Sequence, residues 1–243
     1  MISLVRPDVV LRGEETGAGP TVLLLHAGGE RRRVWQPVIK VLAGAGFRCV
    51  AFDQRGHGDS GGPLRTLAHC AADVVAMLRA EPPGCVVVGA SLGGLAAIAA
   101  LADPGVRARV AGLVLVDVVP DPEPHGVRRF LAAAGLPETH AEIVEDVLAQ
   151  GPRLRQVTAE LDLPVLLVRG DRGSPVTDED AERLRRLVPH AAVTRVRGAG
   201  HLVARDQPVA LAEVIAAVIT EWRAHERDES GDRRAVPGPA AGR

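Results

Sequence analysis

The chain has 243 residues, of which 47% are hydrophobic and 24% are charged, a balance that excludes disordered, fibrous and disulfide-stapled proteins. Lys and Arg total 29 against 30 Asp and Glu, so the net charge indicates neither a nucleic acid nor a membrane as partner. The length suits one large α/β domain, and the absence of tyrosine excludes any mechanism that requires one.

Apolar runs recur along the chain with amphipathic stretches between them. Residues 2–13 are expected to form a short antiparallel edge. Buried strands are then predicted by apolar, β-branched runs at Thr21–His26, Phe47–Asp53, Cys85–Ala90, Gly112–Val118, Pro164–Arg169 and Ala192–Arg197. Helices are predicted over Thr66–Glu81, whose apolar residues share one face, and after the capping-box pattern of Thr177 and Asp180. This alternation predicts a mostly parallel sheet with helices on both faces.

Residues 82–102 carry no charged side chain and are long enough to cross a bilayer. Glycines interrupt the run, however, and its first part, Cys85–Ala90, is β-branched, whereas its second part, Leu95–Ala102, is rich in helix formers. We therefore expect a buried strand that turns into a buried helix. No export signal is visible near the first residue, and the three scattered cysteines favour a reducing compartment, so the predicted location is cytoplasmic.

The segment Gly89-Ala90-Ser91-Leu92-Gly93 stands at the turn between that strand and that helix. Small residues two positions before and two positions after the serine permit a turn that is too tight for larger side chains. Such a turn exposes the Ser91 hydroxyl above the sheet. The alternative is an ordinary glycine-rich strand–helix turn. The strand before the serine and the helix after it favour a nucleophile elbow.

Four blocks of sequence together resemble the α/β-hydrolase superfamily and follow the order of that family: His26–Gly29, Asp53–Ser60, Gly89–Gly93 and Gly198–His201. The resemblance implies the α/β-hydrolase fold, in a serine hydrolase branch similar to esterases and lactonases. Serine at the elbow separates the chain from the epoxide hydrolase and haloalkane dehalogenase branches, which use an aspartate nucleophile there.

The domain organisation follows from the spacing of the strands. We expect a hydrolase core at residues 1–118 and 164–222. Residues 119–163 hold three short helical patterns, around His125–Ala134, Glu138–Gln150 and Arg153–Leu161, and are expected to form a short lid where open α/β sheets bind ligands. Residues 223–243 are charged and then rich in Pro, Gly and Ala, which predicts a disordered tail.

The resemblance implies roles for particular residues. Ser91 would be the nucleophile, and His201, on a glycine-rich loop after the last strand, the base that activates it. A loop histidine that caps the final helix is the alternative interpretation of His201. The backbone N–H groups of Gly28 and Leu92 would form the oxyanion hole. His26 and His57 are expected to brace loops rather than to catalyse.

The acid partner of the histidine departs from the pattern of the family. Its usual position, three residues after Gly170, is occupied by Gly173, and Ser174 follows. Asp171 lies one residue after Gly170, and Asp117 ends the preceding strand, from which some relatives take their acid. We favour Asp117, keep Asp171 as the alternative acid, and leave open a dyad without an acid.

These residues predict an enzyme that needs neither a cofactor nor a metal. It would cleave a carboxylic ester, lactone or thioester through an acyl-enzyme, with a small acyl compound as its substrate. Carbon–carbon bond hydrolysis, a cyclising or releasing step in biosynthesis, and a non-catalytic ligand-binding protein are the alternatives. The sequence leaves the identity of the substrate and the oligomeric state undetermined.

Overall fold

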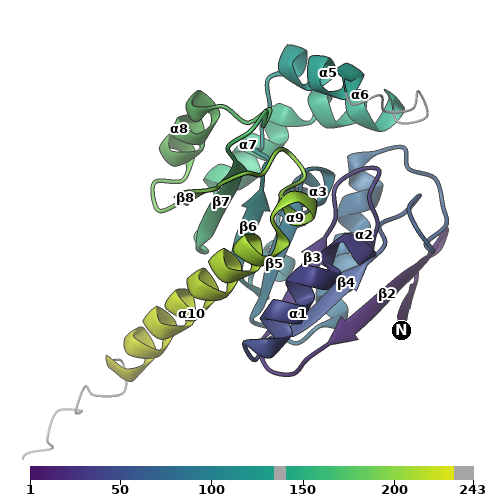
Figure 1. Ribbon diagram of the computed structural model, residues 1–243. Coiled ribbons are helices and arrows are strands. Elements are labelled where there is room, and N and C mark those ends of the chain that lie inside the picture. Colours follow the sequence, from purple (N-terminus) through teal and green to yellow (C-terminus); the bar gives the residue numbers. More distant parts are fainter. Residues whose placement is uncertain (134–140, 233–243) are drawn as a thin grey trace, which may run out of the picture.

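The computed structural model describes residues 1–133 and 141–232. Within these residues, eight strands form one sheet in the order β1-β2-β4-β3-β5-β6-β7-β8 (Figure 1). The strands are β1 Ile2–Val5, β2 Val10–Thr16, β3 Thr21–Leu25, β4 Arg48–Phe52, β5 Cys85–Ala90, β6 Val110–Val116, β7 Val165–Gly170 and β8 Ala192–Val196. β2 pairs antiparallel with β1 and β4, and all other neighbours are parallel. The predicted α/β fold is confirmed.

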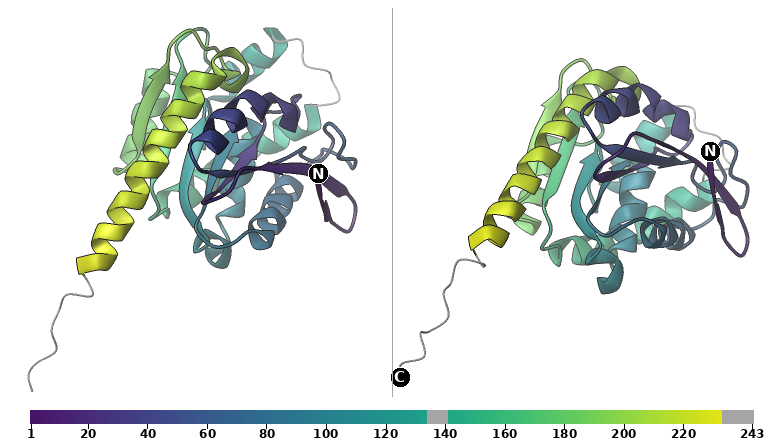
Figure 2. Two further views of the ribbon diagram at one scale, coloured as in Figure 1. Left: turned by 60° about the horizontal axis from the view of Figure 1, so that its bottom comes forward. Right: turned by 90° about the horizontal axis from the view of Figure 1, so that it is seen from below.

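Helices cover both faces of the sheet. They are η1 Arg32–Trp35, α1 Gln36–Gly44, α2 Leu67–Ala80, α3 Leu92–Ala100, α4 Pro104–Arg107, α5 Pro124–Ala133, α6 Ala141–Ala149, α7 Gly151–Ala159, α8 Asp178–Leu187, α9 Val203–Asp206 and α10 Pro208–Asp232. Helices α1 and α10 lie side by side on one face, and α2, α3 and α7 pack on the other (Figures 1 and 2). Because both faces are covered, β3, β5 and β7 are buried along their whole length, which explains their unbroken apolar runs.

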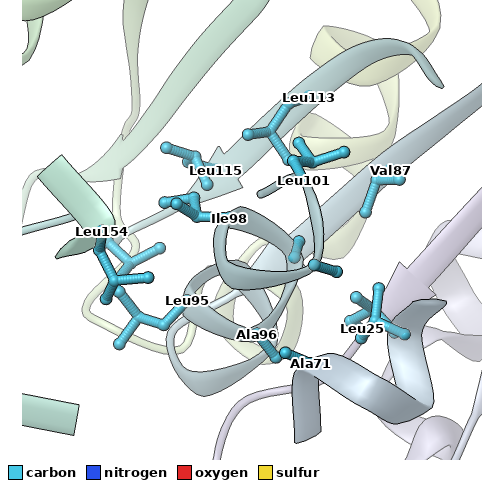
Figure 3. Close-up of a cluster of buried hydrophobic side chains, with 14 of the residues drawn as sticks. Leu25, Ala71, Val87, Leu95, Ala96, Ile98, Leu101, Leu113, Leu115 and Leu154 are labelled. Atoms are coloured by element: carbon cyan, nitrogen blue, oxygen red, sulfur yellow. The ribbon is translucent and has the colours of Figure 1, made fainter. Parts of the chain in front are cut away.

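The centre of one core layer is helix α3. Its side chain Ile98 lies beside Leu115 of β6, and Leu95 lies beside Leu154 of α7 (Figure 3). The charge-free run of the sequence is therefore the central strand β5 followed by this buried helix, as predicted. None of the helices in residues 1–133 and 141–232 combines the length and the apolar character that crossing a bilayer requires.

Threonine caps both of the predicted helices α2 and α8, and the cap at Thr177 is the one that the sequence predicted. The Thr66 hydroxyl accepts a hydrogen bond from the His69 backbone at the start of α2. At α8, Thr177 and Asp180 form a reciprocal capping box. The predicted N-terminal edge is a hairpin, β1–β2, whose second strand continues to Thr16 and joins β4.

The segment predicted as a lid contains α5, α6 and α7. Helices α6 and α7 contact α2, α3 and α8 of the predicted core, whereas α5 lies at the outer end of the segment (Figure 1). Residues 138–140, where the second helical pattern of the sequence begins, lie outside the described residues, as does Ala134 at the end of the first.

The predicted start of the tail at residue 223 is wrong. Helix α10 continues through Asp232, and its C-terminal half extends past the edge of the sheet (Figure 2). The reason is local: residues 223–230 contain no proline or glycine, and Arg, Ala and Glu are good helix formers, so their charge does not end the helix. Residues 233–243 of the predicted tail lie outside the described residues.

Candidate active site

Ser91 lies at the junction of β5 and α3, with φ 47° and ψ −117°. The glycines on either side make this turn possible. A Cβ atom on Gly89 would lie 2.5 Å from Gly94 Cα, and one on Gly93 would lie 2.5 Å from the carbonyl oxygen of Leu25. Both contacts are with backbone, so no larger residue fits. The strained backbone of Ser91 and these close approaches have the geometry expected of a nucleophile elbow.

The two residues expected to supply oxyanion donors adjoin each other. Leu92 is the first residue of α3, and its N–H group therefore has no acceptor within the helix. Gly28 lies against it, because a Cβ atom on Gly28 would be 3.7 Å from Leu92 Cδ2. The structure thus brings the loop after β3 next to the N-terminus of α3.

Two buried histidines brace the loop that carries Gly28. The His26 ring donates from Nδ1 to the carbonyl of Ala27 at 2.8 Å and accepts at Nε2 from the Gln54 N–H at 2.9 Å. The His57 ring accepts at Nε2 from the Gly29 N–H, also at 2.9 Å. Burial lowers the pKa of His26 to about 4, so this ring is neutral at neutral pH. The geometry agrees with a bracing role for both rings.

A buried ion pair, which the sequence reasoning missed, ties the second motif block to η1, the short helix that follows the first block. Asp53 accepts hydrogen bonds from the backbone of Arg32 at 2.7 Å and of Asp59 at 2.8 Å, and it pairs with the Arg32 guanidinium. Both side chains are almost fully buried. This arrangement fixes the start of η1 against the turn that follows β4.

His201 contacts the favoured acid. Its Nδ1 lies 2.8 Å from Oδ2 of Asp117, which follows β6 and is 1% exposed. Asp117 also accepts hydrogen bonds from the Gly170 N–H at 2.9 Å and the Ser174 hydroxyl at 2.7 Å. With Nδ1–H donating to the carboxylate, Nε2 is the nitrogen left to accept a proton.

The alternative acid, Asp171, has a different partner. Its carboxylate accepts a hydrogen bond from the Gly198 N–H at 2.7 Å. It therefore holds the start of the loop that carries His201 rather than the ring itself. The same loop packs directly on the end of β7, where a Cβ atom on Gly170 would lie 2.2 Å from the Gly200 carbonyl oxygen.

Further residues at His201 were not predicted from the sequence. The ring of Phe130, on α5, stands edge to face with the His201 ring at a centroid distance of 4.8 Å. Glu30 is buried and binds Arg205 of α9 at 3.0 Å, and burial raises the pKa of this carboxyl group. The sequence could have pointed to Phe130, because it is the lone Phe, Tyr or Trp among residues 119–163.

The described residues include no cluster of three or more His, Cys, Asp or Glu side chains that could hold a metal ion. Burial raises the pKa of Cys49, Cys70 and Cys85 to about 12, so these thiols are protonated at neutral pH. Neither a metal cluster nor a thiolate is thus found among the residues that the structure describes.

Comparison with known sequences agrees with the geometry. A sequence model described as the alpha/beta hydrolase fold matches residues 20–150. The esterase Rv0045c of Mycobacterium tuberculosis (strain ATCC 25618 / H37Rv) is 31% identical in an alignment 257 positions long, which covers 84% of each chain. A protein of Variovorax paradoxus (strain S110), provisionally named carbamate hydrolase RutD, is 42% identical over 123 residues, and the match spans 45% of that protein and 49% of this chain.

Solved structures share the fold at low sequence identity. A thermophilic esterase from Thermogutta terrifontis superposes with a TM-score of 0.72 at 23% identity, covering 90% of this chain and 97% of that one. A loop variant of a haloalkane dehalogenase from Bradyrhizobium elkanii gives a TM-score of 0.75 at 19% identity, covering 93% and 98%. Enzymes that act on different bonds thus have this same architecture.

Proposed function

The chain belongs to the α/β-hydrolase fold family, and from that premise we propose that it is a cofactor-free serine hydrolase that cleaves a carboxylic ester, lactone or thioester of a small molecule. The observation that carries the proposal is the 2.8 Å contact between His201 Nδ1 and Asp117. It lies at the end of the sheet where Ser91 is found, since the Ser91 N–H donates to the carbonyl of Val116, the residue before Asp117.

Each residue then has a defined step. His201 Nε2 takes the proton of the Ser91 hydroxyl as its oxygen attacks the substrate carbonyl carbon. The carboxylate of Asp117 accepts from Nδ1–H and stabilises the imidazolium that forms. The N–H groups of Gly28 and Leu92 donate to the oxyanion of the tetrahedral intermediate.

The intermediate collapses when the imidazolium of His201 protonates the leaving group, and an acyl-enzyme remains on Ser91. Water then attacks the acyl carbon while His201 again accepts a proton. When His201 returns that proton to the Ser91 oxygen, the acid is released and the hydroxyl is restored. Epoxides and haloalkanes are not expected as substrates, because position 91 carries a hydroxyl where the epoxide hydrolase and haloalkane dehalogenase branches carry a carboxylate.

The test compares the wild type with Ser91→Ala on nitrophenyl esters of short and medium acyl chains. We expect Ser91→Ala to lower kcat by about 10⁴-fold or more, because the other groups cannot supply the nucleophile. A fluorophosphonate probe should label the wild type and leave Ser91→Ala unlabelled. Ser3→Ala, which removes an exposed hydroxyl from β1, is the control and should keep full activity.

The same assay separates the two candidate acids. Asp117→Asn should lose about 10⁴-fold in kcat, while Asp171→Asn should change it little. Loss in Asp171→Asn alone would overturn the choice of Asp117. Equal turnover by the wild type and Ser91→Ala would overturn the nucleophile, and the absence of any labelling by the probe would favour a ligand-binding protein.

A further inference from the structure

Ser174 contacts both oxygens of the carboxylate that holds His201. Its Oγ lies 2.7 Å from Oδ1 and 2.9 Å from Oδ2 of Asp117. The serine is half-buried in the loop between β7 and α8, two strands away from the nucleophile elbow along the sheet. This contact joins the loop after β7 to the residue that follows β6.

The proton of the Ser174 hydroxyl is directed toward the carboxylate. The oxygen accepts a hydrogen bond from the Val176 N–H at 3.1 Å, and the competing acceptor, the Val176 carbonyl, is farther away at 3.4 Å. The hydroxyl has one proton, so it donates most favourably to Asp117. A hydrogen bond from a neutral donor to an ionised acceptor is stronger than one between neutral groups.

Asp117 needs this donor because it is cut off from solvent. Its side chain is 0% exposed, and its donors within the described residues are the Gly170 N–H, the Ser174 hydroxyl and His201 Nδ1–H. When a buried carboxylate loses a hydrogen-bond donor, its desolvation is no longer compensated. Rotation toward the remaining donors is then favoured. Turning would move Oδ2 away from the place where it holds the imidazole.

We propose that Ser174 is a positioning residue for the reaction: its hydroxyl fixes the rotamer of the Asp117 carboxylate and thereby the orientation of His201. This inference rests on the proposed function of Ser91 and His201. Ser174 lines a cavity of about 280 Å³ together with Gly173 and Thr177, so the position is accessible to a conservative substitution.

The experiment compares Ser174→Ala with Ser174→Thr in the full-length protein. Ser174→Ala should lower kcat by about tenfold with KM unchanged, since one hydrogen bond to a charged group is lost and no substrate contact is. Ser174→Thr keeps the hydroxyl and should restore kcat to within about threefold of the wild type. If the two variants lose the same activity, the hydroxyl has no positioning role.

Thr177→Ala is the matched control, because it removes a hydroxyl from the same loop without touching Asp117. It breaks the capping box of α8 and should lower the midpoint of urea unfolding while kcat stays unchanged. A fall in kcat equal to that of Ser174→Ala would show that loop stability, rather than the contact with Asp117, governs the activity, and would overturn the proposal.

A spectroscopic measurement distinguishes failure of this inference from failure of the proposed function. The His201 Nδ1 proton, hydrogen-bonded to a carboxylate, should give a low-field NMR resonance that is independent of turnover. Ser174→Ala should broaden or shift that resonance, and Ser174→Thr should retain it. An unchanged resonance in Ser174→Ala overturns the inference. Loss of the proposed function would appear instead as equal ester hydrolysis by the wild type and Ser91→Ala.

Discussion

The floor of the candidate site and its cover are held by different interactions. We use floor for the β5–α3 turn and the loop at residues 26–30, and cover for helix α5 and the exposed side chains of α6 that it contacts. In the floor, the backbone at Gly93 approaches Leu25 so closely that no side chain fits between them. In the cover, an exposed ion pair joins Arg128 to Glu145 at 2.8 Å, with side chains 53% and 60% exposed.

Helices α6 and α7 anchor the cover, since Ile143, Val147, Leu154 and Val157 are buried in the same hydrophobic cluster as α3. The Asp146 carboxylate of α6 accepts from the Leu67 N–H at 2.7 Å, and α5 reaches the floor through the ring contact of Phe130 with His201. Exposed ion pairs contribute little to stability, whereas buried close packing tolerates almost no change. We infer that the chemistry depends on a floor that is positioned in advance, and that the cover can vary with the substrate.

Of all the changes, Gly93→Ala should cause the largest loss of stability, because it disturbs the packing of the floor. Its Cβ would meet the Leu25 and His26 carbonyl oxygens at 2.5 and 2.8 Å, so the strand and the helix must separate. The free energy of unfolding should fall by about 3 kcal/mol, measured by urea denaturation. Gly44→Ala is the control: no atom lies within 4 Å of its Cβ, and the exchange should be neutral or slightly stabilising. Equal losses in the two variants would contradict a tightly packed floor.

The second-largest effect should be a dependence of the free energy of unfolding on pH, which His26 in the floor causes. The pKa of His26 is lowered by burial from 6.5 to about 4, so the unfolded chain binds this proton more readily than the folded one. Stability is then fully present above about pH 6.5 and falls as the pH drops toward 4, by about 3 kcal/mol in total.

Urea denaturation between pH 7 and pH 4.5 measures this effect. His26→Asn removes the titrating ring and should show a shallower loss of stability in acid than the wild type. His225→Asn, which alters an exposed histidine of α10, should follow the wild-type curve. Parallel curves for the wild type and His26→Asn would mean that His26 does not destabilise the folded state when it is protonated.

Phe130→Ala should have the smallest effect on stability, because the cover contributes little to it. We expect a change of less than about 1 kcal/mol in the free energy of unfolding. Its effect should instead appear in specificity, as a rise in kcat/KM for long acyl chains relative to short ones, since the ring occupies space beside His201. Phe130→Leu keeps the apolar bulk and should resemble the wild type. A stability loss as large as that of Gly93→Ala would remove the distinction between floor and cover.

Much of the sheet was predictable because its signals are local. The run of apolar residues before Ser91 and the small residues around it specify a strand, a tight turn and a helix without reference to the rest of the chain. The capping box at Thr177 was predictable for the same reason. The end of α10 was not, since the same charged composition suits both a solvated helix and a tail.

The sequence by itself determined the order of strands and helices, the elbow at Ser91 and the two aspartates that could partner His201, because each depends on residues that are neighbours in the chain. Only the tertiary structure decided that His201 contacts Asp117 and not Asp171. The physical reason is the parallel pairing of β6 with β7, which brings Asp117, Ser174 and the His201 loop to one end of the sheet from three separate parts of the chain.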